Sequence, residues 1–147
     1  MAQLDDREIA TQLFNRCWEL LEKTRDHDDD VELLTAAFTS RYHWLSVGDL
    51  DTRIISDWMV ARAAAALGDG ELSILYAKRA HAVAQENTVP DWLSASCAEG
   101  VARAYAAAGD AAEFNNWSAL TTRLISAIAD PDDQSLISSQ FADIDVP

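Results

Sequence analysis

Two alanine-rich helical runs, each ending in Gly-Asp, occupy the middle of the chain and most constrain its fold. They lie between Leu50 and Asp110 and end at Gly68-Asp69 and Gly109-Asp110. Glycine readily takes the left-handed conformation that ends a helix, and the following aspartate can cap the next helix. Small residues at helical spacing let neighbouring helices approach closely. The segment therefore predicts antiparallel helical hairpins.

The same helical periodicity extends over the rest of the chain. Apolar residues recur three and four positions apart, as in amphipathic helices, and no alternating β-branched run favours a strand. The expected helices span about 4–24, 31–47, 50–67, 70–87, 91–108, 111–129 and 131–144. The prediction is a single all-α domain over residues 1–147, with about seven antiparallel helices. They stack as hairpins at about 4–47, 50–87 and 90–129, with a capping helix at about 131–144.

Two of the expected turns have a specific predicted conformation. Gly48 is expected to end its helix in the left-handed conformation, like the other two boundary glycines. The acidic tract from Asp26 to Asp30 is expected to be a solvated turn whose last aspartate caps the following helix. This reading is favoured over a calcium site, because the tract lacks the glycine of a calcium-binding loop.

Composition narrows the classes of partner. The 147 residues carry a formal net charge of -14, which would repel nucleic acid and anionic membranes, because phosphate binding requires clustered Lys and Arg. No apolar run approaches the roughly 20 residues of a membrane span, and the N-terminus does not resemble a signal peptide. Cys17 and Cys97 are isolated, as expected for buried free thiols in a reducing compartment. We therefore expect a cytoplasmic protein.

Motifs for catalysis, cofactors and metals are missing from the sequence. There is no nucleophile elbow, no phosphate-binding glycine loop and no HExxH pattern. An acid–base pair of His43 with Glu99, or a metal set of His43, His81 and Asp91, has no spacing that favours it. No catalytic residue, metal ligand or cofactor is therefore predicted.

Part of the chain resembles the tetratricopeptide repeats. The matching residues are Leu67-Gly68-Asp69-Gly70-Glu71 followed by Ser73, Ala77 and Ala80, and Ala104-Tyr105 before Ala108-Gly109-Asp110. Ser73 and Phe114 depart from the family pattern, which prefers alanine and a small residue at these positions. The resemblance covers residues 50–129 and implies a right-handed α-α superhelix.

A narrower resemblance is to a group of small bacterial tetratricopeptide-like proteins. It is carried by Tyr42-His43-Trp44, Trp58 with Arg62, Glu86-Asn87, Asp91, and Glu99 followed by Ala102-Arg103-Ala104-Tyr105. This resemblance implies the fold and a soluble bacterial protein. It implies no established activity.

The candidate binding residues are ionisable and aromatic side chains on the first helix of successive hairpins, which lines the concave face in such folds. With His43 from helix two, they are Trp58, Arg62, Trp92, Ser96, Glu99 and Arg103. An aromatic wall with a guanidinium could hold a carboxylate or an acidic peptide end. Alternatively, these residues form an internal polar network, in which Glu99 and Arg103 make an ordinary i, i+4 ion pair.

Three hypotheses for function follow. The first is a non-enzymatic module that binds a protein or peptide partner. The second is a pocket for a small anionic ligand, or an enzymatic pocket, built from polar residues of the second, third and fifth helices. The third is a homodimer formed through exposed end faces. The first two differ in whether Arg62 and Arg103 are fully paired inside the protein or face a cavity.

Overall fold

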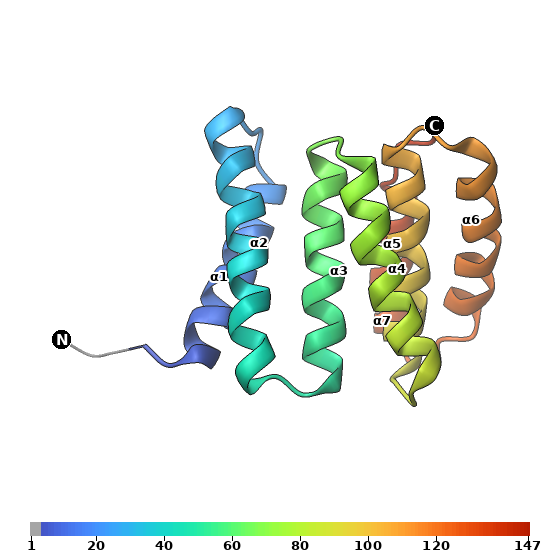
Figure 1. Cartoon of the computed structure of the whole chain (residues 1–147). Helices are drawn as coiled ribbons and strands as arrows, with labels where there is room; N and C mark the ends of the chain where they lie inside the picture. The colour runs from blue at the N-terminus through green and yellow to red at the C-terminus, as the bar shows by residue number, and fades with distance from the viewer. Residues whose placement is uncertain (1–3) are drawn as a thin grey trace.

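The computed structural model describes residues 4–147, and this part of the chain forms seven α-helices and no strand (Figure 1). The helices are α1 (Asp6–Leu21), α2 (His27–Val47), α3 (Leu50–Ala66), α4 (Gly70–Glu86), α5 (Asp91–Ala107), α6 (Ala111–Ser126) and α7 (Pro131–Ala142). The all-α prediction with seven helices is confirmed. None of these helices is both long and apolar enough to cross a membrane.

The helices form an inner and an outer row. Each helix packs against the next one in the chain, and α1, α3, α5 and α7 also contact one another in succession. The outer helices α2, α4 and α6 pack mainly on their neighbours in sequence, and only side chains bridge them: Phe38 of α2 lies against Tyr76 of α4, and His81 of α4 lies against Trp117 of α6. Figure 1 shows the three hairpins side by side, with α1 and α7 behind the plane of α2, α3 and α4.

Small residues allow close contact between the inner helices. Ala63 and Ala64 on α3 and Ala102 on α5 are fully buried. Gly100 lies so close to the Trp58 indole that a Cβ added there would be 3.1 Å from the ring. This tight packing explains why α3 and α5 are rich in alanine.

Two Gly-Asp turns end one helix and start the next, as the sequence predicted. Gly68 and Gly109 have positive φ angles of 79° and 74°. After α3, the Asp69 N–H donates to the Ala64 carbonyl at 2.9 Å, while the Asp69 carboxylate accepts from the Leu72 N–H at 3.0 Å. One aspartate therefore closes α3 and caps α4, satisfying backbone groups at both helix ends.

The prediction for Gly48 was wrong. Its φ of -74° is not left-handed. Glycine is required here because a Cβ would lie 2.6 Å from the Trp44 carbonyl oxygen and 2.6 Å from Thr52 Oγ1. The constraint is steric and combines the Trp44 carbonyl of α2 with the Thr52 side chain of α3, so it depends on how the turn brings the two helix ends together.

The acidic tract is also organised differently from the prediction. The tract forms the first turn of α2, which begins at His27, and Asp26 rather than Asp30 is the N-cap. Asp26 accepts from the Asp29 N–H at 2.8 Å, and the Asp29 carboxylate accepts in return from the Asp26 N–H. Lys23 also pairs with Asp29 at 2.9 Å. Acidic groups are stable in this turn because the helix N-terminus is positive.

Candidate functional site

Two neighbouring cavities lie in the groove between α1 and α7, where α3 and α5 form the floor. We call the larger one the arginine pocket, with a volume of about 360 Å³. Its lining residues come from the ends of α1, α3 and α5 and from the segment after α7: Leu21, Arg25, Arg62, Ala65, Ala66, Arg103, Ala106, Ala107, Asp143, Ile144 and Asp145. It thus contains three guanidinium groups and two carboxylates.

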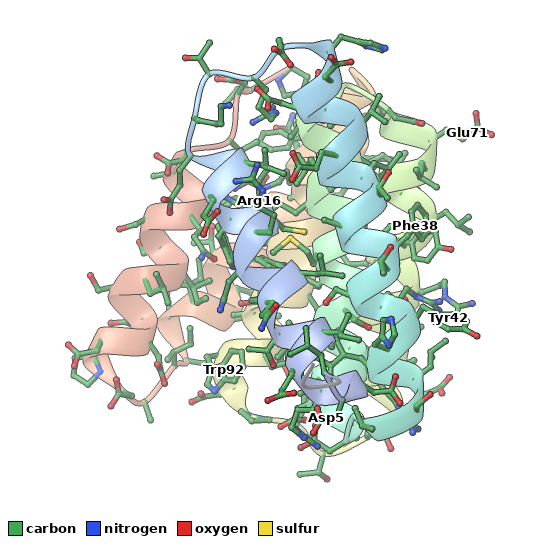
Figure 2. The ribbon with its side chains drawn as sticks, turned by 90° about the vertical axis from the view of Figure 1, so that its left-hand side faces the viewer. Asp5, Arg16, Phe38, Tyr42, Glu71 and Trp92 are labelled. Atoms are coloured by element: carbon green, nitrogen blue, oxygen red, sulfur yellow. The ribbon has the colours of Figure 1, made fainter. Side chains whose placement is uncertain are left out.

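The smaller cavity, the aromatic cleft, has a volume of about 170 Å³. Its walls are mainly apolar: Phe14, Ile55, Trp58, Trp92, Leu93, Ser96, Leu136, Ile137 and Gln140. Figure 2 shows Trp92 between α1 and α7, on the side of the molecule opposite to Phe38 and Tyr42 of α2. The cleft therefore opens on the inner face of the helical stack.

Arg62 is the unpaired cation of the arginine pocket. Its guanidinium carbon lies 5.0 Å from the ring centroid of Trp18 and 5.6 Å from that of Trp58. Nη1 is buried without a hydrogen-bond partner, and no carboxylate of residues 4–147 lies within ion-pair distance. Burial, and next the charge of Arg103, lowers the pKa of Arg62 to about 10. The side chain is still charged at neutral pH.

Arg103 differs from Arg62 because it is paired with a carboxylate inside the protein. Its Nε and Nη2 donate to Oε1 of Glu99 at 3.0 and 2.6 Å, and Nη2 also donates to the Gln140 carbonyl at 2.7 Å. Glu99 is only 1% exposed, and its Oε2 has no partner. The predicted i, i+4 ion pair is confirmed, and the hydrogen bond from Arg103 to the Gln140 carbonyl ties α5 to α7.

Arg25 is also internally paired. Its Nε donates to Asp30 Oδ1 at 2.8 Å, and its two Nη atoms donate to the carbonyls of Leu20 and Ala66 at 3.2 and 3.3 Å. These bonds hold the α1–α2 loop against the end of α3. Of the three guanidinium groups in the pocket, Arg62 alone has no anionic partner among the residues described.

The two carboxylates of the pocket are likewise unpaired. Asp143 follows α7 directly as its C-cap, and Asp145 lies two residues further along an irregular segment. Neither has a Lys or Arg partner among residues 4–147. Ile144 between them is 8% exposed and packs into the core, so the segment is anchored against the fold.

The pocket and the cleft adjoin. Trp58 forms part of the cleft and lies beneath the Arg62 guanidinium, while its Nε1 donates to the Ser96 carbonyl at 3.1 Å. Gln140 lines the cleft and accepts from Arg103 of the pocket. Trp58, Trp92 and Ser96 therefore line the cleft, while Arg62 and Arg103 line the pocket beside it.

His43 is separate from this group. Its Nδ1 lies 2.7 Å from Asp6 Oδ1, and it lines neither the pocket nor the cleft. Because Glu99 pairs with Arg103, His43 and Glu99 do not form the acid–base pair considered from sequence. Within residues 4–147, no group of three or more His, Cys, Asp or Glu side chains is placed to hold a metal ion.

Several residues of the site were missed by sequence reasoning. They are Phe14, Trp18, Leu136 and Gln140 on helices, and Arg25, Asp143 and Asp145 outside them. The spacing of Trp18 fits a buried apolar stripe of its helix, so the sequence does not mark it as a site residue. The others become part of the site because α7 folds back beside α1, which helical periodicity does not predict.

Comparisons of the chain with protein-family models, with curated proteins and with solved structures found no match.

Proposed function

We propose that this protein is a non-enzymatic interaction module, which binds a short segment of a partner protein in the groove between α1 and α7. In this proposal the arginine pocket holds a carboxylate of that segment, and the aromatic cleft holds one of its apolar side chains. The single observation that carries the proposal is the partnerless Arg62 guanidinium at the wall of the pocket. The resemblance to tetratricopeptide repeats, which implies a groove lined by the inner helices, supports the same class.

A buried guanidinium nitrogen without an acceptor is unfavourable, because it has lost its water and gained no hydrogen bond. The rings of Trp18 and Trp58 offset only part of this loss, since cation–π contacts do not saturate the N–H donors. A carboxylate entering the pocket would accept from Arg62 with the geometry that a guanidinium favours. The unliganded arrangement is thus already suited to an anionic group.

The neighbouring cleft favours a peptide over a small anion alone. It is apolar, and Leu136 on its α7 side is 57% exposed, a large apolar surface without a covering residue. A peptide can place an apolar side chain there and a carboxylate in the pocket next to it. A small carboxylate metabolite, the alternative, would occupy the pocket and leave the cleft empty.

The proposal can be tested by NMR titration of the tryptophan indole N–H signals. The probe is acetyl-Leu-Gly-Gly with a free C-terminal carboxylate, compared with the same peptide as its C-terminal amide. We expect the acid to shift the Trp58 signal and to bind at least about tenfold more tightly than the amide, because a charged hydrogen-bond pair is lost in the amide.

The matched variants are Arg62→Met and Arg123→Met, which remove the same charge. Arg123 is exposed on α6 and lines neither cavity. Arg62→Met should abolish binding of the acid, and Arg123→Met should leave it unchanged. Equal binding of acid and amide, equal effects of the two substitutions, or no response at millimolar peptide would each contradict the proposal. Acetate binding as tightly as the peptide would assign the pocket to small anions.

A further inference from the structure

The unpaired charges of the arginine pocket have both signs. Arg62 supplies one cation at the wall, and Asp143 and Asp145 supply two carboxylates from the segment after α7. The other charges of the pocket are neutralised, since Arg25 pairs with Asp30 and Arg103 pairs with Glu99. The field left for a ligand is therefore dipolar rather than simply positive.

From this arrangement we infer that the pocket takes the dipolar end of a peptide, a C-terminal lysine or arginine. Its main-chain carboxylate lies against Arg62, and its basic side chain lies against Asp143 and Asp145. The inference rests on the proposed function and specifies the partner segment that the groove binds. The partner segment would then carry a cationic side chain in addition to its terminal carboxylate and its upstream apolar side chain.

A purely anionic ligand satisfies only half of this pocket. Its carboxylate would neutralise Arg62 but would add a third negative charge beside Asp143 and Asp145. A basic side chain on the same residue as the carboxylate removes this repulsion and pairs with the two aspartates. Both unpaired signs are then neutralised by a single residue of the partner.

The charge of the whole chain favours the same ligand. With a net charge of -14, the protein repels acidic segments at long range and attracts basic ones. A peptide ending in a basic residue is attracted by this field, and only its terminal carboxylate must find the local positive charge of Arg62. The long-range field of the protein and the local charges of the pocket therefore both favour a peptide with a basic C-terminal residue.

The aspartates are held in position before a ligand binds. Ile144 between them is buried at 8% exposure, packs with Phe141 of α7, and donates its N–H to the Phe141 carbonyl at 3.3 Å. Because the segment is anchored, placing its two carboxylates at the pocket requires little additional ordering on binding.

The test compares three probes on the wild-type protein by the same indole titration. They are acetyl-Leu-Gly-Lys and acetyl-Leu-Gly-norleucine, both with a free carboxylate, and free lysine. The first two differ only in the charge at the end of the last side chain. We expect the lysine peptide to bind about threefold to fivefold more tightly, the range of an exposed ion pair, and this preference should decline with added salt.

The variants are the double substitution Asp143→Asn with Asp145→Asn, and the control Asp132→Asn. Asp132 is exposed in the first turn of the same helix and does not line the pocket. The double variant should lose the preference for the lysine peptide, whereas the control should keep it. All three positions are exposed, so circular dichroism is expected to show unchanged folding.

Several outcomes would overturn the inference. Equal binding of the two peptides to the wild type would show that Asp143 and Asp145 do not interact with the basic side chain of the peptide. Tighter binding of both peptides by the double variant would make the aspartates internal competitors for Arg62. Free lysine binding as tightly as the lysine peptide would assign the site to a free amino acid.

The experiment distinguishes a failure of the proposed interaction module from a failure of the inferred basic C-terminus. If neither peptide acid binds, or if Arg62→Met does not weaken them, the interaction module itself is rejected. If the norleucine peptide binds in an Arg62-dependent way and the lysine peptide binds no better, the module remains and only the basic C-terminus is rejected.

Discussion

Replacing Arg62 by methionine should stabilise the protein, because the guanidinium is kept in a site that disfavours its charge. Desolvation, followed by repulsion from Arg103, lowers its pKa to about 10, roughly two to three units below the ordinary value of an arginine. At about 1.4 kcal/mol per pKa unit, the charged side chain costs the folded state about 3 kcal/mol relative to water. Methionine removes this cost and keeps an unbranched chain that can pack against the same rings.

The substitution also removes favourable contacts. Cation–π interactions with Trp18 and Trp58 contribute about 0.5–1 kcal/mol each at partly exposed sites, and both are lost with Arg62. The net stabilisation is then about 1–2 kcal/mol. For a chain of this length, that corresponds to a rise in Tm of about 3–6 °C.

The assay is urea unfolding followed by tryptophan fluorescence, with thermal unfolding by circular dichroism as a second measurement. Arg123→Met is the control for net charge and should change the free energy of unfolding by less than about 0.5 kcal/mol. Because the pKa of Arg62 is lower in the folded than in the unfolded state, its penalty is fully present at neutral pH. The penalty is lost progressively as the pH rises above about 10, so the advantage of methionine should shrink there.

A loss of stability in Arg62→Met, by more than about 1 kcal/mol relative to Arg123→Met, would refute this reasoning. It would mean that the guanidinium holds the helices together as part of an internal network with Glu99. Arg62 would then be a structural residue, and the case for a ligand at the arginine pocket would lose its main support.

Further predictions concern the core and the turns. Glu99→Gln should lower the free energy of unfolding by about 3 kcal/mol in urea titrations, because it leaves a partly buried arginine without its carboxylate; a neutral effect would contradict the importance of this pair. Burial raises the pKa of both Cys17 and Cys97 to about 12, so neither thiol should react with Ellman's reagent at neutral pH until the protein unfolds; rapid reaction in native buffer would be inconsistent with their burial. Gly70→Ala should destabilise by about 1–3 kcal/mol in thermal unfolding, since its Cβ would lie 2.5 Å from the Ala108 Cα; an unchanged Tm would show that this contact relaxes freely.

The number and order of the helices could be predicted because the Gly-Asp boundaries are encoded locally. Asp69 and Asp110 act as N-caps in the structure, and Gly68 and Gly109 take the left-handed conformation. These signals depend on residues within one turn of the helix end. Gly48 could not be assigned in the same way, because its constraint is the close approach of the Trp44 carbonyl and the Thr52 side chain in the folded turn.

The candidate site was predicted only in part, for a related reason. Helical spacing placed Arg62 and Arg103 on the inner face and allowed the Glu99–Arg103 pair, but it could not show that Arg62 lacks a partner or that Arg103 also binds α7. The contact with α7 depends on the Gln140 carbonyl, which reaches Arg103 only through the position of that helix. Arg25 and Asp143 come to the same pocket from a loop and a helix end, where periodicity carries no information.

The separation of the outer helices has a mechanical consequence. The backbones of α2, α4 and α6 do not pack on one another, and only side chains join them: Phe38 of α2 lies against Tyr76 of α4, and His81 of α4 lies against Trp117 of α6. Bending of the stack is therefore resisted mainly by the contacts between successive hairpins. The first hairpin packs less extensively on α3 than α4 packs on α5. One side of the groove, α1, belongs to that first hairpin, and the opposite side, α7, packs on α5 and α6. The width of the groove is therefore set by two junctions, that of the first hairpin with α3 and that of α7 with the third hairpin.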